Sequence, residues 1–337
     1  MENNEVWVFV EQRSGKPADV SFELLSKGRK LADSMGGQLK AVVIGHEVKN
    51  IAIDSFKYGT DECYLIDHPE LFYYRTIPYG RILNQLISKH TPRIVLFGAT
   101  VTGRDLAPRV ASSTRSGLTA DCTDLKVSDV TYLGKNFKKL LLQIRPAFGG
   151  NIIATIITPD VHIQMATVRE GVMQMHAVDN PKKPKITEIL FTPEEIDNVL
   201  RVIEQHREES KVNLKAAPII VSGGYGLGSK ENFNLLFELA HIIGGEVAGS
   251  RAAVDAGFIG PERQVGQTGV TVRPKLYIAV GISGAIQHRA GMQEANKIIA
   301  INTDPEAPIF EISHYGIVGD AVDVIPKLVE AYKNKLK

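Results

Sequence analysis

The sequence has few cysteines and almost no net charge, and each of these shortages excludes a class of protein. Cys63 and Cys122 are the only cysteines among 337 residues. They stand far apart and without a metal-ligand spacing, which excludes a disulfide scaffold and a cysteine-bound iron–sulfur cluster and gives no reason to expect a metal site. We expect both to be buried thiols. The formal net charge of +1 provides no electrostatic footprint for nucleic acid or an anionic membrane.

Long hydrophobic runs are also absent. No apolar stretch approaches the roughly 20 residues that a membrane-spanning helix needs. The chain enters a strand-like run, Val6 to Val10, almost directly, and no cationic segment with an apolar core and a cleavage site precedes it. We therefore expect no signal peptide, and a cytoplasmic protein fits. The one basic cluster, Lys182 to Lys185, predicts a solvated linker rather than a binding patch.

The first half alternates apolar runs with amphipathic stretches, in a chain long enough for two domains. The apolar runs predict strands, and the stretches with helical spacing predict helices. Strands are expected at Val6–Val10, Leu39–Ile44, Ile94–Phe97 and Ile152–Ile157, and helices at Ser21–Met35, Gly80–Lys89 and Gly103–Ser113. Strands alternating with helices of this length predict a parallel sheet covered by helices on both faces.

A polar stretch with two prolines, Asn180 to Lys185, predicts the end of the compact first half. A helix is then expected to open with Thr192 as its N-cap and Pro193 at its first position. The later part of that helix, Gln205 to Ser210, is polar and predicts a linker. We therefore expect two doubly wound α/β domains, residues 1–206 and residues 207–337.

The second half begins again with a strand and repeats the alternation. Strands are expected at Pro218–Val221, Leu276–Val280, Ile298–Ile301 and Pro308–Ile312, and helices at about Glu231–Ile243 and at Val322–Asn334. This spacing predicts a second doubly wound sheet.

Five turns rich in small or polar residues lie between Gly249 and Asp320, and most of them follow a short apolar run. Each supplies backbone amides, hydroxyls or carboxylates at a strand end, as an extended phosphate-bearing ligand requires of an open parallel sheet. The turns are Gly249-Ser250-Arg251, Gln264-Val265-Gly266-Gln267-Thr268-Gly269, Gly281-Ile282-Ser283-Gly284-Ala285-Ile286-Gln287-His288, Asn302-Thr303-Asp304 and Gly316-Ile317-Val318-Gly319-Asp320.

A glycine run just upstream, Gly223 to Gly228, matches neither phosphate-binding signature that it suggests. Ser229 stands where a dinucleotide fingerprint beginning at Gly224 needs its third glycine. The P-loop is excluded because Gly228 is followed by Ser229 and only then by Lys230. A tight turn between a strand and a helix is the simpler interpretation.

The turn around Ser283 allows two interpretations. It falls one residue short of a nucleophile elbow, and Ser283, Asp304 and His314 follow the chain order of a hydrolase triad. Only ten residues separate that Asp and His, and no oxyanion loop is evident. We favour the second interpretation, a phosphate cradle at a helix that starts near Ala285, because unpaired N–H groups there attract an anion.

Histidine 288 closes this loop. From its spacing alone, a ligand-binding role and a structural role for His288 are equally open.

Several segments carry a family resemblance. They are Gly249–Gly257, Gln264–Gly269, Leu276–His288, and Ala307–Phe310 with Tyr315–Val318 in the second half, and Gly103–Arg109 and Gly117–Cys122 in the first. Together they closely resemble the electron-transfer flavoprotein alpha subunit family. The resemblance implies an N-terminal α/β domain and a C-terminal flavodoxin-like domain that binds FAD. It also implies a heterodimer with a beta subunit, which carries AMP or a second FAD.

The resemblance further implies roles for individual residues. Arg251 would lie against the isoalloxazine with Ser250 beside it, Thr268 would bond near N5, and His288 would bond near the C2 carbonyl. The remaining cofactor-binding residues are Val265, Gly266 and Gln267 in the flavin pocket, Ser283, Gly284, Ala285, Ile286 and Gln287 at the pyrophosphate, and Asn302 and Asp320 at the adenosine end.

These residue types suit flavin chemistry. Reduction adds electron density near N5 and the C2 carbonyl, and a fixed arginine cation with a histidine donor stabilises it. One departure concerns the glycine-rich turn, where Tyr225 stands in place of an arginine that many family members have. That arginine is expected near the FAD phosphates or ribityl chain, so its contact is not carried over to this chain.

The implied function is electron transfer to a partner flavoenzyme such as an acyl-CoA dehydrogenase. Electron bifurcation from NADH to ferredoxin, through a second FAD in the beta subunit, is one hypothesis, and simple electron carriage is another. Two alternatives of a different class are a hydrolase built on Ser283 and a nucleotide-binding scaffold without redox activity.

Overall fold

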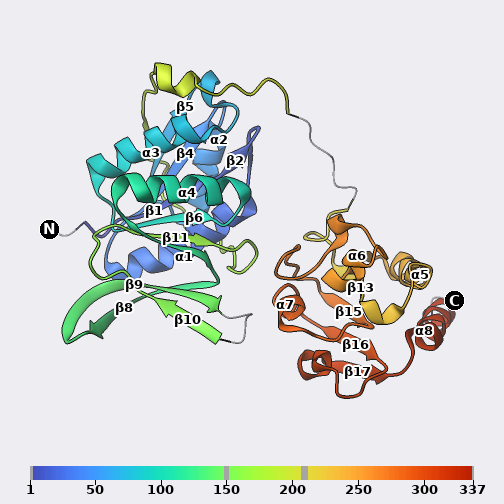
Figure 1. The fold of residues 1–337 in the computed structure, drawn as a ribbon. Coiled ribbons are helices and arrows are strands. Elements are labelled where there is room, and N and C mark those ends of the chain that lie inside the picture. The colour runs from blue at the N-terminus through green and yellow to red at the C-terminus, as the bar shows by residue number, and fades with distance from the viewer. Residues whose placement is uncertain (1–2, 148–151, 206–211, 336–337) are drawn as a thin grey trace. The chain divides into compact units, whose positions relative to one another are not determined.

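The computed structural model describes residues 3–147, 152–205 and 212–335, and these fold as two compact units (Figure 1). Unit 1 comprises the described residues up to 205, and unit 2 those from 212 onward. The expected linker lies, apart from Gln205, outside the described residues.

Unit 1 is built on a seven-stranded sheet in which every neighbouring pair of strands is parallel. The strand order is β12-β5-β4-β1-β6-β11-β7. The strands are β1 (Val6–Val10), β4 (Leu39–Gly45), β5 (Glu62–Asp67), β6 (Ile94–Gly98), β7 (Gly117–Cys122), β11 (Gln164–Val168) and β12 (Ile186–Glu188). The central strands are buried along their whole length, as in a sheet covered on both faces.

Helices cover the two faces of this sheet in pairs (Figure 1). Alternate residues of β1 point to opposite faces, so that Val8 belongs to the core under α1 and α2, and Trp7 to the core under α3 and α4. The helices are α1 (Asp19–Met35), α2 (Lys49–Ser55), α3 (Thr76–His90) and α4 (Val101–Thr114), and a small hairpin joins β2 (Gln12–Arg13) to β3 (Lys16–Pro17). The expected helices therefore form, each beginning a few residues early.

A separate antiparallel sheet carries one predicted strand. Strand β9 (Lys135–Ala147) pairs with β8 (Asp124–Tyr132) on one side and β10 (Ile152–Ile156) on the other. The prediction that Ile152–Ile157 joins the parallel sheet is therefore wrong. Strand β10 pairs instead with the strand nearest to it in sequence, as antiparallel neighbours can, and the fully buried β11 takes the place beside β6.

The chain beyond Asn180 continues unit 1 rather than ending it. Strand β12 lies along the edge of the parallel sheet and pairs with β5. Lys182 and Lys185 bind Asp61 and Glu62 at that edge. The lysine-rich stretch is therefore attached to the sheet by ion pairs, which its composition alone did not indicate.

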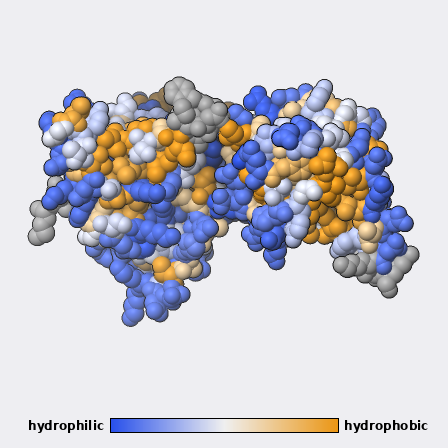
Figure 2. All heavy atoms as spheres, turned by 90° about the horizontal axis from the view of Figure 1, so that it is seen from below, coloured by the Kyte–Doolittle hydropathy of each residue, from blue (hydrophilic) through white to orange (hydrophobic). Residues whose placement is uncertain are grey.

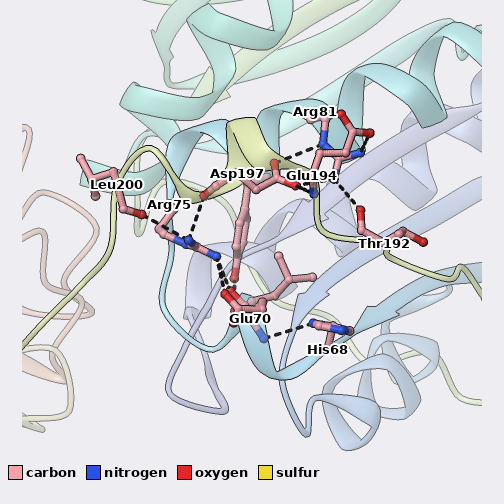
Figure 3. A network of polar contacts seen from close by, with 10 residues as sticks. His68, Glu70, Arg75, Arg81, Thr192, Glu194, Asp197 and Leu200 are labelled. Atoms are coloured by element: carbon pink, nitrogen blue, oxygen red, sulfur yellow. Dashed lines mark hydrogen bonds and ion pairs between the residues drawn. The ribbon is translucent and has the colours of Figure 1, made fainter.

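The helix expected from Thr192 is reduced to one 3-10 turn, Glu195–Asn198, with Glu194 as its N-cap. Figure 3 shows the polar contacts that this segment makes with Arg75 and Arg81. The Arg75 guanidinium donates to the carbonyl oxygens of Asp197 and Leu200, at 2.9 and 3.2 Å, and these are acceptors that a longer helix would use itself. The buried Asp197 carboxylate also accepts from Arg81 at 2.5 Å. Arg75 and Arg81 thus hold the segment from Glu194 to Leu200 against α3.

Both cysteines are buried, as expected. Cys63 lies in β5 and Cys122 in β7, and neither forms a disulfide. Burial raises the pKa of each thiol to about 12, so both stay protonated and unreactive at neutral pH.

On the face drawn in Figure 2, broad apolar areas lie between hydrophilic areas. Among the described residues, no helix is both long enough and apolar enough to cross a membrane.

Unit 2 is built on a five-stranded parallel sheet in the order β14-β13-β15-β16-β17. The strands are β13 (Ile219–Gly223), β14 (Glu246–Gly249), β15 (Leu276–Val280), β16 (Ile298–Asn302) and β17 (Tyr315–Val318). Counted from β13, this is the 2-1-3-4-5 order of flavodoxin-like folds, which places a topological switch point between β13 and β15.

Two long helices, α5 (Phe233–Ile243) and α8 (Ala321–Lys335), cover one face of this sheet (Figure 1). Loops cover the other face, together with the short α7 (Ile286–Arg289), while α6 (Arg251–Asp255) follows β14. The strand predicted at Pro308–Ile312 is wrong, because these residues form a 3-10 helix. Proline at its first position favours a helical turn, and the Ile309 amide donates to the Ser283 carbonyl of a neighbouring loop at 3.0 Å.

Candidate functional site

A cavity of about 720 Å³ opens at the carboxyl ends of the unit 2 strands, across the switch point. This volume lies in the range of small-molecule sites, roughly 300–1,000 Å³. The lining residues are Tyr225, Gly226, Ser250, Arg251, Ala252, Asp255, Gln264, Val265, Gly266, Gln267, Thr268, Gly281, Ile282, Ser283, Ala285, Gln287, His288, Asn302, Asp304, Ala307 and Pro308. Four of the five polar turns selected from the sequence therefore meet in one site.

Two glycine-rich loops form the floor of the site by packing backbone against backbone. The Gly224 amide donates to the Val280 carbonyl at 2.8 Å, and the Gly226 amide donates to the Gly281 carbonyl at 3.1 Å. A β-carbon on Gly224 would lie 2.0 Å from the Gly281 oxygen. The glycine run thus fits close loop packing rather than a dinucleotide fingerprint.

The loop after β15 presents unused hydrogen-bond donors. Among the described residues, the amides of Ser283, Gly284 and Ala285 and the Ser283 hydroxyl have no protein partner. Gly284 adopts a φ of +87°, and a β-carbon there would lie 2.2 Å from the Ile309 nitrogen. The loop is therefore held tightly by Gly284 while its donors are left for a ligand, as phosphate groups require.

The loop after α6 contributes a hydroxyl that is already oriented. Thr268 Oγ1 accepts a hydrogen bond from Gln264 Nε2 at 2.9 Å, which leaves the hydroxyl proton available to a ligand acceptor. The Gln267 amide donates to the Gln287 carbonyl at 2.7 Å. The two loops are thereby joined next to Thr268.

Charge in the cavity wall is sparse. Ser250 is the N-cap of α6 and accepts from the Ala253 amide, so that Arg251 begins this helix at the wall. Arg251 Nε lies 3.3 Å from the Asp255 carboxylate, and both side chains are largely exposed. Asp304 adds a second carboxylate. With one arginine against two aspartates in the wall, an anionic ligand must be held mainly by amides and hydroxyls.

His288 is buried in the wall and differs from the exposed groups around it. Its Nε2 lies 3.0 Å from the Tyr277 hydroxyl, while the buried Nδ1 has no hydrogen-bond partner among the described residues. Burial lowers the pKa of His288 to about 4, although the nearby Val265 carbonyl acts in the opposite direction. The imidazole is therefore neutral at pH 7, and its Nδ1 is a buried polar atom without a hydrogen bond of normal geometry among the described residues.

Family models match both units. The model described as electron transfer flavoprotein domain matches residues 6–193, and the model described as electron transfer flavoprotein FAD-binding domain matches residues 213–293. The chain belongs to the electron transfer flavoprotein alpha subunit family.

Full-length relatives agree with this assignment. The electron transfer flavoprotein subunit alpha of Thermoanaerobacterium thermosaccharolyticum is 49% identical over 99% of this chain and 98% of its own length. Protein FixB of Clostridium saccharobutylicum is 48% identical over 97% of this chain and 96% of its own length. Protein FixB of Azotobacter vinelandii is 46% identical over 98% of this chain and 91% of its own length. This family membership supports electron transport and flavin binding for the chain.

Three of the residues that the family resemblance selected do not line the cavity. Gly284 and Ile286 stand next to residues that do. The Asp320 carboxylate accepts from the Val322 amide at 2.9 Å at the start of α8. Asn302 lines the cavity and donates to the Ile282 carbonyl at 3.0 Å, which ties the end of β16 to the loop after β15.

The cavity also includes residues that the sequence reasoning had not selected as cofactor-binding. They are Tyr225, Gly226, Ala252, Asp255, Gln264, Gly281, Ile282, Asp304, Ala307 and Pro308. Gln264, Gly281, Ile282 and Asp304 lie within the polar turns, so including whole turns would have found these four. Asp255 had a further signal, because it stands four residues after Arg251 on a helical segment.

Tyr225, at the position where the family resemblance led us to expect an arginine, lies at the cavity wall with its ring largely exposed. The ring stacks on Phe258 with a centroid distance of 5.7 Å and an interplanar angle of 12°. The position is thus filled by a neutral aromatic surface rather than by a cation.

The hydrolase alternative does not assemble in this unit. Ser283 follows the carboxyl end of β15, whereas His314 lies beside Ile298 at the amino end of β16. The Nδ1 atom of His314 already accepts from the Ile298 amide at 3.1 Å. Because Ile298 pairs with Tyr277, the length of a strand separates the two groups and no triad forms.

Proposed function

We propose that unit 2 binds one FAD in the cavity and that the chain passes electrons to and from a partner flavoenzyme as the alpha subunit of a heterodimer. The observation that carries this proposal is the combination of unused donors at Ser283, Gly284 and Ala285 with the unpartnered His288 nitrogen. The unused donors suit a pyrophosphate, and the His288 nitrogen suits a carbonyl oxygen of the isoalloxazine ring. Bound FAD would supply the redox chemistry.

The chain's own residues would place the two ends of the cofactor. Arg251, Thr268 and His288 would surround the isoalloxazine ring, with Val265 to Gln267 lining its pocket. Asn302, at the end of β16, would stand at the adenosine end. Asp320 is assigned there as well, with one carboxylate oxygen on the Val322 amide. The buried wall at His288 would exclude water from the ring carbonyl.

The proposed partners follow from family membership. A beta subunit carrying AMP or a second FAD would complete the heterodimer, and an acyl-CoA dehydrogenase is the proposed class of flavoenzyme partner. Within that complex, electrons would come from NADH and reach ferredoxin if the beta subunit's FAD bifurcates them. Simple electron carriage from acyl-CoA dehydrogenases needs only the FAD of this subunit.

The test of the proposed cofactor is flavin bound per heterodimer after coexpression with the beta subunit, measured by FAD released on denaturation. Gly284→Ala should abolish binding in unit 2, because its β-carbon would collide with the Ile309 nitrogen. Gly244→Ala is the matched control, since Gly244 is also left-handed, with a φ of +71°, but has open space around its β-carbon position. Equal flavin content in both variants would contradict the proposed site.

The electron-transfer step needs a separate experiment. The heterodimer should reduce or oxidise an acyl-CoA dehydrogenase in stopped-flow mixing, whereas a nucleotide-binding scaffold would hold FAD without exchanging electrons. NADH oxidation coupled to ferredoxin reduction would support bifurcation. With both flavins bound, an absence of NADH oxidation would support simple carriage.

A further inference from the structure

The buried hydroxyl group of Tyr277 lies next to the His288 ring. Tyr277 lies in β15 with its side chain fully buried, and its hydroxyl is 3.0 Å from His288 Nε2. Tyr277 does not line the cavity, so it contacts a ligand only through the histidine. Ser222, on the adjacent strand β13, is also fully buried and lies beside the same hydroxyl, outside hydrogen-bond geometry.

The direction of this hydrogen bond follows from the chemistry of the two groups. Both are neutral near pH 7, since burial raises the pKa of Tyr277 and lowers that of His288. A phenol is the better proton donor, and an unprotonated imidazole nitrogen is the better acceptor. In a dry environment the pair therefore favours the phenolic O–H donating to Nε2 over the reverse arrangement.

The direction of this hydrogen bond determines which ring nitrogen of His288 carries the proton. A neutral imidazole that accepts at Nε2 must carry its proton at Nδ1. Nδ1 is the buried atom without a hydrogen bond of normal geometry among the described residues, although the Val265 carbonyl lies near the ring, and His288 lines the cavity. A buried N–H without a well-placed acceptor is costly, so a ligand oxygen that reaches Nδ1 would gain this hydrogen bond.

We propose that Tyr277 is a positioning residue, which donates to Nε2 of His288 and holds the imidazole as the Nδ1–H tautomer. The cavity thereby offers a neutral, pre-oriented donor to a carbonyl oxygen. The identity of that oxygen as the C2 carbonyl of FAD rests on the proposed function, whereas the tautomer itself does not.

The tautomer can be measured without the cofactor. Nitrogen-15 NMR of the full chain with labelled histidine distinguishes protonated from unprotonated ring nitrogens, and His288→Asn identifies the His288 signals. We expect Nδ1 protonated and Nε2 unprotonated in the wild type near pH 7. A protonated Nε2 in the wild type would overturn the proposal, and this measurement needs no core variant to fold.

Tyr277→Phe removes the hydroxyl while keeping the ring in its packing. We expect a mixture of the two His288 tautomers and FAD binding weakened by about two- to tenfold, because only the Nδ1–H fraction binds. Tyr315→Phe, at a largely exposed tyrosine of the same unit, is the control and should change neither value. An unchanged tautomer in folded Tyr277→Phe would overturn the proposal, whereas failure of the wild type to bind FAD would overturn only the proposed function.

Two replacements of His288 distinguish the roles of its two ring nitrogens. The asparagine amide nitrogen occupies a place near Nδ1, and the glutamine amide nitrogen a place near Nε2. His288→Asn should therefore retain more FAD affinity than His288→Gln. The reverse order would contradict Nδ1–H as the donor to the ligand.

Discussion

Among the described residues, Arg251 is the only lysine or arginine in the cavity wall. Its partner Asp255 is largely exposed and 3.3 Å away, so solvent screens this ion pair and its contribution to stability is small. The guanidinium is thus available to a ligand. Its effect on a bound flavin would be electrostatic.

Arg251→Ala should lower the first reduction potential of bound FAD, because the cation that favours added negative charge is removed. A loss of ~1.4 kcal/mol corresponds to about 60 mV for one electron. Spectroelectrochemical titration measures the potential. Arg251→Lys is the matched control and should recover part of the loss, and identical potentials in all three proteins would rule out this role.

His288 should make unit 2 sensitive to acid. Its pKa is about 4 in the folded chain against an ordinary value of 6.5. Between these values the unfolded chain binds a proton that the folded chain does not, so the contribution to stability is full above pH 6.5 and is lost as the pH falls toward 4. The lowered pKa corresponds to about 3 kcal/mol.

His288→Gln should remove this part of the acid sensitivity. Hydrogen exchange of the β15 amides, measured near pH 7 and near pH 4 without FAD, gives the free energy of unfolding of unit 2. His241→Gln is the control, because His241 is exposed in the same unit and its replacement should leave the wild-type dependence intact. Equal pH dependence in the two variants would show that His288 does not titrate as described.

At the scale of single elements, the start of α4 shows how unit 1 joins two strand ends. The Thr100 hydroxyl accepts from the Gly103 amide at 2.9 Å as N-cap of α4 and donates to the Glu11 carboxylate, just past β1, at 2.5 Å. Burial raises the pKa of Glu11, and the hydrogen bond from Thr100 opposes this. One side chain thus caps a helix and satisfies a partly buried carboxylate.

Thr100→Ala should lower the free energy of unfolding of unit 1 by about 1–2 kcal/mol, the usual loss for a helix N-cap. Urea unfolding followed by tryptophan fluorescence measures it, because Trp7 is the only tryptophan and is buried in β1. Thr131→Ala, at an exposed position of β8, should stay within about 0.5 kcal/mol of the wild type. A loss of the same size in both variants would deny the capping role.

At the scale of the whole molecule, the described residues that line the cavity all belong to unit 2. FAD should therefore raise the melting temperature of unit 2 and leave unit 1 unchanged. A free FAD concentration 100 times the dissociation constant adds about 2.7 kcal/mol of stability. Calorimetry reports the unit 2 transition and Trp7 fluorescence reports unit 1. An equal shift in both would show that the units unfold together.

Local patterns in the sequence were sufficient to predict most helices and strands and the main loops of the site. The apolar runs at β1, β15 and β16 and the amphipathic stretch at α3 are strong enough that burial in any sheet–helix packing gives the same elements. Polar turns after such strands meet at one sheet edge because parallel strands share their carboxyl ends. Motif resemblance then indicated the family, which the family models and the relatives confirm.

Tertiary structure alone decided where the weaker segments went. Residues after Thr192 had a helix signal, but the Arg75 guanidinium takes the carbonyl oxygens that a helix would need. The run at Pro308 became a 3-10 turn because the Ile309 amide binds the loop at Ser283. The sequence by itself determined two α/β units and a sheet edge at which polar turns meet, since both depend on local periodicity. The pairing of Tyr277 with His288 depends on contacts between β15 and α7, which no local pattern encodes.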